Sequence, residues 1–105
     1  MPNVIEGKSK NMAGPLLRGG DIAVAACEAI QIDNPGKDII VEDHQTYVRV
    51  EADGGLIIRR QTMSEILGRP FEMQELEVNL SGFSGQIATD QDYMKWYFKL
   101  DKLES

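Results

Sequence analysis

The apolar and polar positions of residues 21–36 follow the period of a helix and then stop at a turn. One face carries small and branched apolar residues at helical spacing: Ile22, Ala25, Ala26, Ala29 and Ile30. Asp21 suits the N-cap position, and Pro35-Gly36 suits a turn, so the helix should end before Asp33. The pattern predicts a helix that packs closely against a sheet.

Strand-like stretches come next, because apolar and β-branched residues alternate or cluster over 38–42, 46–51 and 55–60. Asp53-Gly54 is a strong hairpin signal, so we expect the last two stretches to pair antiparallel. The clearest period of two in the chain comes near its end, and its apolar positions are Met94, Trp96, Phe98 and Leu100. It predicts a half-buried strand with one aromatic face.

Two short helices should lie between these strands. Thr62 and Glu65 fit a capping box, and the helix that they begin should stop at Gly68, because Arg69-Pro70 cannot easily continue it. Residues 71–78 predict a further turn or two of helix. The expected fold is therefore α+β, a small single domain with antiparallel sheet packed against about three helices.

The stretch NLSGFSGQI, residues 79–87, begins like a strand but contains two glycines and two serines around Phe83. Glycine inside a strand usually marks a bulge, a turn or a close approach by another backbone. Phe83 either turns into the core at such a bulge or is displayed to a partner.

The length and charge of the chain limit the number of domains and the classes of partner that it suits. The 105 residues suit one domain, and 11 Lys+Arg against 17 Asp+Glu give a formal charge of -6. That sign argues against nucleic acid and against anionic membranes as partners. No apolar run approaches the roughly 20 residues of a membrane span, and the first residues lack the apolar region of a secretory signal, so we expect a soluble, cytoplasmic protein. Residues 1–13 contain few large apolar side chains, so we expect them to form a disordered tail, and we expect residues 14–105 to form the folded domain.

Candidate catalytic residues are few. Cys27 and His44 are each the one residue of their kind, which rules out an intramolecular disulfide and a histidine or cysteine metal cluster. Cys27 adjoins the alanine-rich helix face and suits a small buried position, and His44 suits a surface connection between strands. The three carboxylates that lie close together in the sequence, Glu72, Glu75 and Glu77, suit a solvated helix face. We therefore predict no catalytic, cofactor or metal site, and binding in place of catalysis.

Four segments of the chain, in order, resemble the effector proteins of soluble bacterial di-iron monooxygenases. They are IDNPGK, VEDHQTYVRVEADGGLI, EILGRPFEMQELEVNLSGFSGQI and the closing aromatic strand. The resemblance is closest to the effectors of toluene monooxygenases and covers roughly residues 14–100. It implies a cofactor-free regulatory component that binds a di-iron hydroxylase and raises the rate and coupling of toluene-type aromatic hydroxylation. The sequence does not give the oligomeric state of the free protein, and we take a monomer as the default expectation.

The same resemblance places Asn79, Ser81, Gly82 and Phe83 on the surface that faces the hydroxylase, and we extend this partner-binding set to Ser84 and Gly85. Asn34 joins the set, although its sequence leaves open whether residues 34–36 contact the partner or only turn the chain. Two other functions stay open: a small-molecule-sensing α+β module, and a small enzyme that uses His44 or Cys27.

Overall fold

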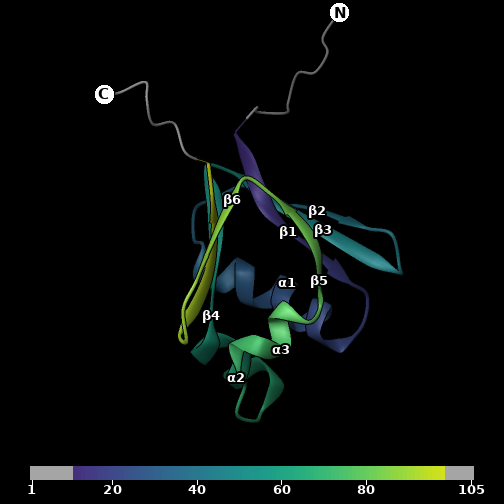
Figure 1. Ribbon diagram of the computed structural model, residues 1–105, viewed down its shortest axis with the longest axis vertical. Helices are drawn as coiled ribbons and strands as arrows, with labels where there is room; N and C mark the ends of the chain where they lie inside the picture. Colours follow the sequence, from purple (N-terminus) through teal and green to yellow (C-terminus); the bar gives the residue numbers. More distant parts are fainter. Residues whose placement is uncertain (1–10, 99–105) are drawn as a thin grey trace, which may run out of the picture.

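The computed structural model describes residues 11–98, and within them the chain forms seven strands and three helices. The strands build two antiparallel sheets, one in the order β2-β3-β1-β5 and one in the order β4-β7-β6. The sheets converge at one end of the molecule, and the helices fill the space between them at the other end (Figure 1). The prediction of an α+β domain with antiparallel sheet and about three helices is confirmed.

The four-stranded sheet is built around β1 (Met12–Arg18), which the sequence pattern did not predict. This strand pairs with β3 (Tyr47–Asp53) on one side and with β5 (Leu80–Ser84) on the other, and β2 (Ile40–Asp43) lies beyond β3. The predicted tail therefore ends too late, because Ala13 is fully buried in β1. The rest of that tail, residues 1–10, lies outside the described residues.

The predicted hairpin at Asp53-Gly54 is wrong, because β3 and β4 (Gly55–Arg59) belong to different sheets. Both edges of β3 are taken by β1 and β2, so the chain leaves that sheet at Gly54 and Gly55, whose φ angles are 84° and 108°. In the three-stranded sheet β7 (Tyr93–Tyr97) is central and pairs with β4 and β6 (Gln86–Thr89).

Helix α1 (Asp21–Asp33) packs against α2 (Arg60–Leu67) and β4. The predicted N-cap of α1 is off by one residue: Gly20 occupies it, and Asp21 begins the first turn. The predicted capping box of α2 is wrong, because the helix starts at Arg60 and the Thr62 hydroxyl donates to Asp33 Oδ1 at 2.7 Å. Gly68 ends α2 as predicted, in the left-handed conformation with φ 71°.

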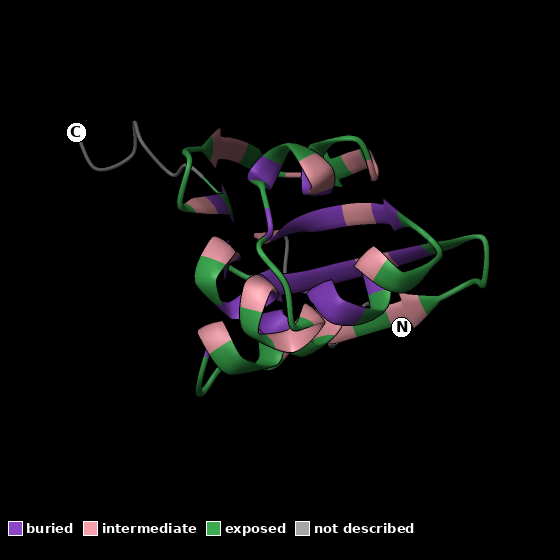
Figure 2. Ribbon diagram, turned by 90° about the horizontal axis from the view of Figure 1, so that it is seen from below, coloured by how far each residue is buried: buried purple, intermediate pink, exposed green. Residues whose placement is uncertain are grey.

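The core lies between the sheets and under α1, where buried residues line the inward faces of strands and helices (Figure 2). The period of two in β7 is confirmed for Met94 and Trp96, which are both fully buried. Phe98 departs from the period of two and is 39% exposed, since β7 ends at Tyr97. The remaining predicted apolar position, Leu100, lies outside the described residues. Among the helices of residues 11–98, none has the length and apolar character to cross a membrane.

Candidate functional site

Helix α3 (Met73–Glu77) leads the chain into segment 79–85, which holds most of the predicted partner-binding residues. Its apolar side is anchored, since Met73 and Leu76 are buried and Phe71, just before the helix, is fully buried. The Glu72 backbone N–H donates to Glu75 Oε2 at 3.1 Å and fixes the helix start. The helix is shorter at both ends than the predicted residues 71–78, and it gives segment 79–85 a rigid starting point.

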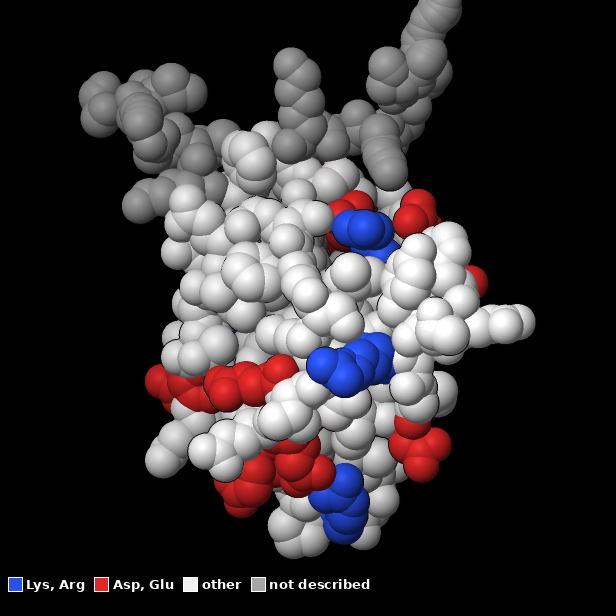
Figure 3. All heavy atoms as spheres, turned by 45° about the vertical axis from the view of Figure 1, so that its right-hand side comes forward, with Lys and Arg blue, Asp and Glu red and all other residues white. Residues whose placement is uncertain are grey.

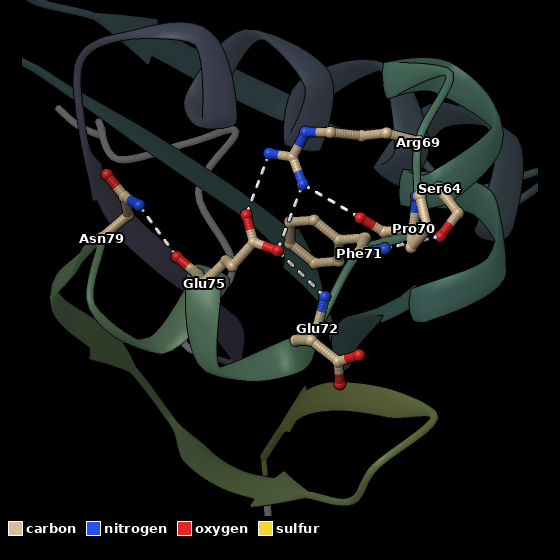
Figure 4. A network of polar contacts seen from close by, with 7 residues as sticks. All are labelled: Ser64, Arg69, Pro70, Phe71, Glu72, Glu75 and Asn79. Atoms are coloured by element: carbon tan, nitrogen blue, oxygen red, sulfur yellow. Dashed lines mark hydrogen bonds and ion pairs between the residues drawn. The ribbon is translucent and has the colours of Figure 1, made fainter.

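An ion pair between Arg69 and Glu75 joins the α2–α3 connection to α3 (Figure 4). Arg69 Nη2 lies 2.9 Å from Glu75 Oε1 and Nη1 lies 3.2 Å from Oε2, while Nη1 also donates to Pro70 O. These side-chain hydrogen bonds, with the bond from the Glu72 backbone, lower the pKa of the Glu75 carboxyl. Glu75 is thus held charged by defined partners, beyond the simple solvated role predicted for it.

Asn79 closes α3 and does not point freely into solvent. Its side-chain Nδ2 donates to Glu75 O at 2.8 Å (Figure 4). Its backbone carbonyl accepts from the Arg18 N–H at 2.8 Å. The residue is half-buried. Asn79 therefore connects the end of α3 to the end of β1 and sets where β5 begins.

The glycine-rich part of the segment contains a bulge in β5. Leu16 of β1 pairs with Gly82, but the next residue, Leu17, pairs with Leu80, so Ser81 is the extra residue. Ser81 is exposed and Gly82 is half-buried, and a Cβ at Gly82 would only reach Leu16 Cδ2, at 4.0 Å. A bulge was one of the expected readings of this sequence, and it leaves the backbone here accessible.

Phe83 is displayed and not turned into the core, since it is 45% exposed. It lies on β5, an edge strand of the four-stranded sheet, opposite Pro15 of β1. Val78, at the end of α3, is another large apolar residue in this part of the chain and is 69% exposed. Exposed aromatic residues on an otherwise ordered strand are typical of anchors at protein interfaces.

Ser84 and Gly85 hold the end of the segment. The Ser84 hydroxyl donates to Glu51 Oε2 of β3 at 2.7 Å. Gly85 has φ 84°, and a Cβ there would lie 2.6 Å from Ala13 Cβ and 2.7 Å from Tyr97 O. The chain passes at this point from β5 in one sheet to β6 in the other, which a larger residue would obstruct.

Asn34 lies apart from this segment and has a structural environment. The residue is 8% exposed; its Nδ2 donates to Ile30 O and Ile57 O, each at 2.8 Å, and its Oδ1 accepts from the Ile57 N–H at 3.0 Å. The side chain is thus fully engaged in joining α1 to β4. This position favours the turn and core role that the sequence left open for residues 34–36.

Of the two candidates for a small enzyme, Cys27 lacks activating surroundings, and His44 has one carboxylate near it, with His44 Nε2 3.9 Å from Glu42 Oε1. Burial, and secondarily the charge of Asp43, raises the pKa of the Cys27 thiol, which disfavours the nucleophilic thiolate. His44 is exposed and stacks on Tyr47, with ring centroids 4.7 Å apart. Within residues 11–98 there is no group of three His, Cys, Asp or Glu side chains that could hold a metal ion.

A cavity of about 260 Å³ opens where β3 passes into β4, lined among others by Lys37, Gly55, Ile57 and Lys95. Ligand sites usually occupy roughly 300–1,000 Å³. Lys37 Nζ is already engaged by the backbone carbonyls of Asp53 and Gly55. The cavity therefore gives the small-molecule-sensing alternative only weak support.

Charge is distributed and not concentrated. On the face shown in Figure 3, Lys and Arg side chains stand apart from one another, acidic groups lie beside several of them, and a broad uncharged area separates them. Among the described ion pairs, Arg49 lies 3.7 Å from Glu42 and 3.6 Å from Glu51. Recognition by this face would depend on shape and apolar contact more than on one charged patch.

Sequence reasoning missed Glu51 as a residue of the site. Its alternation with Val48 and Val50 predicts an outward position, and outward carboxylates are ordinarily exposed. In the structure Glu51 is 8% exposed: β1 lies beside β3 and β5 lies beyond β1, and Ser84 of β5 and Arg49 of β3 contact the Glu51 carboxylate. No local signal could have revealed this, since β1 itself was not predicted.

Comparison with known proteins places the chain in a family. The model of the MmoB/DmpM family matches residues 11–97, nearly all of the described chain. The match includes α3, the bulged strand β5 and both sheets. It therefore rests on the whole domain and not on the short motifs alone.

Two relatives and one solved structure illustrate the similarity. The effector subunit of the alkene monooxygenase system of Xanthobacter autotrophicus (strain ATCC BAA-1158 / Py2) is 34% identical over 95 residues, 90% of this chain and 94% of the relative. The stimulatory component DmpM of phenol 2-monooxygenase from Pseudomonas sp. (strain CF600) is 39% identical over 72 residues, 69% of this chain and 78% of the relative.

The solved structure is that of a phenol hydroxylase–regulatory protein complex. One chain of it superposes with a TM-score of 0.74 at 27% identity, covering 84% of this chain and 99% of its own length. The resemblance to monooxygenase effectors seen in the sequence is confirmed by these matches. The protein belongs to the MmoB/DmpM family.

Proposed function

We propose that the protein is a regulatory component that binds the hydroxylase of a multicomponent monooxygenase and raises its rate and its coupling of reducing equivalents to product. Family membership supports this, since the relatives are named as effector, stimulatory or regulatory components and not as catalytic ones. The single observation on this chain that carries the proposal is Phe83, a large aromatic ring displayed on the bulged edge strand β5.

The effect on the hydroxylase would come through differential affinity. A bound protein shifts the conformational equilibrium of its partner only as far as it binds one state more tightly than another. Segment 79–85 suits that task, because it presents Phe83 and the small residues on an edge strand that begins after α3 and ends before Gly85. The iron and the oxygen chemistry would belong to the hydroxylase, which the family resemblance implies is a di-iron enzyme.

The substrate is the finer part of the proposal. We infer an aromatic hydrocarbon of the toluene type, and the relative named for phenol supports an aromatic substrate. The relative named for alkenes marks the competing possibility. Toluene, phenol and a short alkene, assayed in parallel with the cognate hydroxylase, decide between them: strongest stimulation with the alkene would overturn the aromatic assignment.

The test of function is a titration. Purified hydroxylase and its electron-transfer partners are titrated with this protein, and product formed per NADH consumed is recorded. A saturable rise in rate and coupling is expected, with no turnover by this chain alone. A flat titration with the cognate hydroxylase would contradict the proposal.

Phe83→Ala tests the surface within the same assay. We expect the half-saturating concentration to rise by roughly thirtyfold or more, because a central aromatic anchor contributes about 2 kcal/mol or more to binding. Val24→Ala is the matched control, an exposed apolar residue of α1 that is 69% exposed. Equal behaviour of both variants, with thermal unfolding unchanged, would remove Phe83 from the interface.

A further inference from the structure

Glu51 is a buried carboxylate on the face of β3 that points away from the core. Its neighbours Val50 and Ala52 are fully buried on the inner face, so Glu51 belongs to the outer one, where it is nevertheless 8% exposed. A carboxylate is removed from water only at a high free-energy cost, unless charged or polar partners replace the water. The partners of Glu51 therefore indicate why it is there.

The side chain of Glu51 reaches across a whole strand. Ala13 pairs with Ala52 and Leu16 with Arg49, so the register places Gly14 of β1 opposite Glu51, and Gly14 pairs on its other side with Ser84. Gly14 has no side chain, and a Cβ there would overlap Val50 O. The close approach of the two backbones and the bare position let the carboxylate of Glu51 reach β5.

Two partners hold that carboxylate. The Ser84 hydroxyl donates to Glu51 Oε2 at 2.7 Å, and Arg49 Nη1 lies 3.6 Å from the same oxygen. Arg49 also pairs with Glu42 of β2 at 3.7 Å. A row of polar side chains thus runs across the outer face of the sheet, from β2 through β3 and over β1 to β5.

The hydrogen bond reaches β5 where its backbone is weakly supported. Pro15, which pairs with Phe83, has no N–H to donate. The bulge at Ser81 interrupts the ladder on one side of Phe83, and the turn at Gly85 ends the strand on the other. A side-chain bond at Ser84, the residue directly after Phe83, therefore restrains the part of β5 that displays the ring.

We propose that Glu51 is a positioning residue for docking, which acts through Ser84 to hold β5 in the conformation that presents Phe83 to the hydroxylase. This inference rests on the proposed function. It assigns part of the affinity for the hydroxylase to a residue that does not touch the partner and is nearly inaccessible to it.

The experiment is the hydroxylase titration with variants of this one bond. Ser84→Ala should raise the half-saturating concentration by roughly three- to tenfold, because a hydrogen bond to a charged group is lost. The maximal rate at saturation should stay unchanged, since Phe83 still binds once the segment is ordered by the partner. Ser84→Thr keeps a hydroxyl at the same position and should restore the original midpoint.

A double-variant cycle identifies Glu51 as the partner through which Ser84 acts. Glu51→Ala with Ser84→Ala should weaken docking no more than the stronger single variant, because each change removes the same hydrogen bond. Thr46→Ala is the control: Thr46 is an exposed hydroxyl residue between β2 and β3, outside segment 79–85, and its loss should leave the midpoint where it was. Thermal unfolding of each free variant confirms that the assays use folded protein.

Every outcome has a consequence. An unchanged midpoint for Ser84→Ala, failure of Ser84→Thr to restore it, or fully additive effects with Glu51→Ala would each overturn the positioning role. If Phe83→Ala also has no effect, the proposed function of segment 79–85 fails as well. If Phe83→Ala weakens docking while Ser84→Ala does not, the positioning role alone is lost.

Discussion

At the residue scale, exposure separates side chains that the sequence had grouped together. Phe83 and Asn34 were predicted for the same partner-binding set, yet Phe83 is 45% exposed and Asn34 is 8% exposed with its polar atoms engaged inside the chain. A large apolar ring gains free energy when a partner covers it, whereas an amide that is already satisfied gains little. The proposed binding surface is therefore centred on segment 79–85 and leaves Asn34 out.

Cys27 offers a prediction at this scale. Burial and the charge of Asp43 raise the pKa of its thiol, so less thiolate is present at a given pH than in an ordinary cysteine. We expect alkylation by iodoacetamide at pH 8 to be about tenfold slower in the folded protein than in guanidinium, and the folded rate to rise only at higher pH.

Asp43→Asn serves as the matched variant for Cys27. It keeps an oxygen that can accept from the Gln45 N–H but removes the negative charge, so alkylation should become modestly faster. Folded and denatured rates that coincide at pH 8 would contradict the raised pKa. Rates are measured by mass spectrometry of the alkylated chain.

At the element scale, the end of α1 is a junction of three elements. Asp33 accepts from the Thr62 hydroxyl of α2 at 2.7 Å and from the Arg59 N–H at 2.9 Å, and Asn34 bonds to Ile30 and Ile57. Polar side chains beside Pro35-Gly36 would be read as turn residues from sequence alone. Here they join the helix to β4 and to α2.

Asn34→Ala should therefore destabilise the fold. The partly buried Ile57 N–H and the carbonyls of Ile30 and Ile57 lose their partner, at a cost of about 2 to 3 kcal/mol in the free energy of unfolding. Urea unfolding measures this, with Gln31→Ala on the exposed side of α1 as control. Hydroxylase affinity should not change at temperatures where the variant is folded; a weakened affinity without loss of stability would return Asn34 to the interface.

At the scale of the whole molecule, two glycine corners join the sheets. The chain passes from β3 to β4 at Gly54 and Gly55, and from β5 to β6 at Gly85, and all three have positive φ. A Cβ at Gly55 would overlap Trp96 O, and one at Gly85 would crowd Ala13 and Tyr97. These corners set how the sheets meet and hence where β5 presents its edge.

Gly55→Ala tests the corner between β3 and β4, and its effect on the free energy of unfolding is compared with that of the same change at Gly36, where the space for a Cβ is open. The overlap with Trp96 O and the positive φ together should cost more than about 3 kcal/mol, or prevent folding. Gly36→Ala is the control, since Gly36 has φ 83° but no atom within 4 Å of a Cβ, and should cost only about 1 kcal/mol. Denaturant unfolding that gives equal losses would show that strain in φ alone matters.

Much of the fold could be predicted because local rules apply within a few residues. The alanine-rich face of α1, the stop at Gly68 and the alternation of Met94 and Trp96 each depend on neighbours along the chain, and all appear in the structure. The predicted caps at Asp21 and Thr62 did not form, because Gly20 and a tertiary bond to Asp33 replaced them. Candidate residues of the site were found largely through the family resemblance.

The sequence by itself determined the class of fold, the positions of its helices and the unusual composition of segment 79–85, because helical and strand periods and turn residues act locally. Only the tertiary structure decided which strands pair. Asp53-Gly54 became a corner between sheets because β1 occupies the edge of β3 that a hairpin would use. The same pairing of β1 buried Glu51 and left β5 at an edge with Phe83 exposed, since burial depends on strands that are distant along the chain.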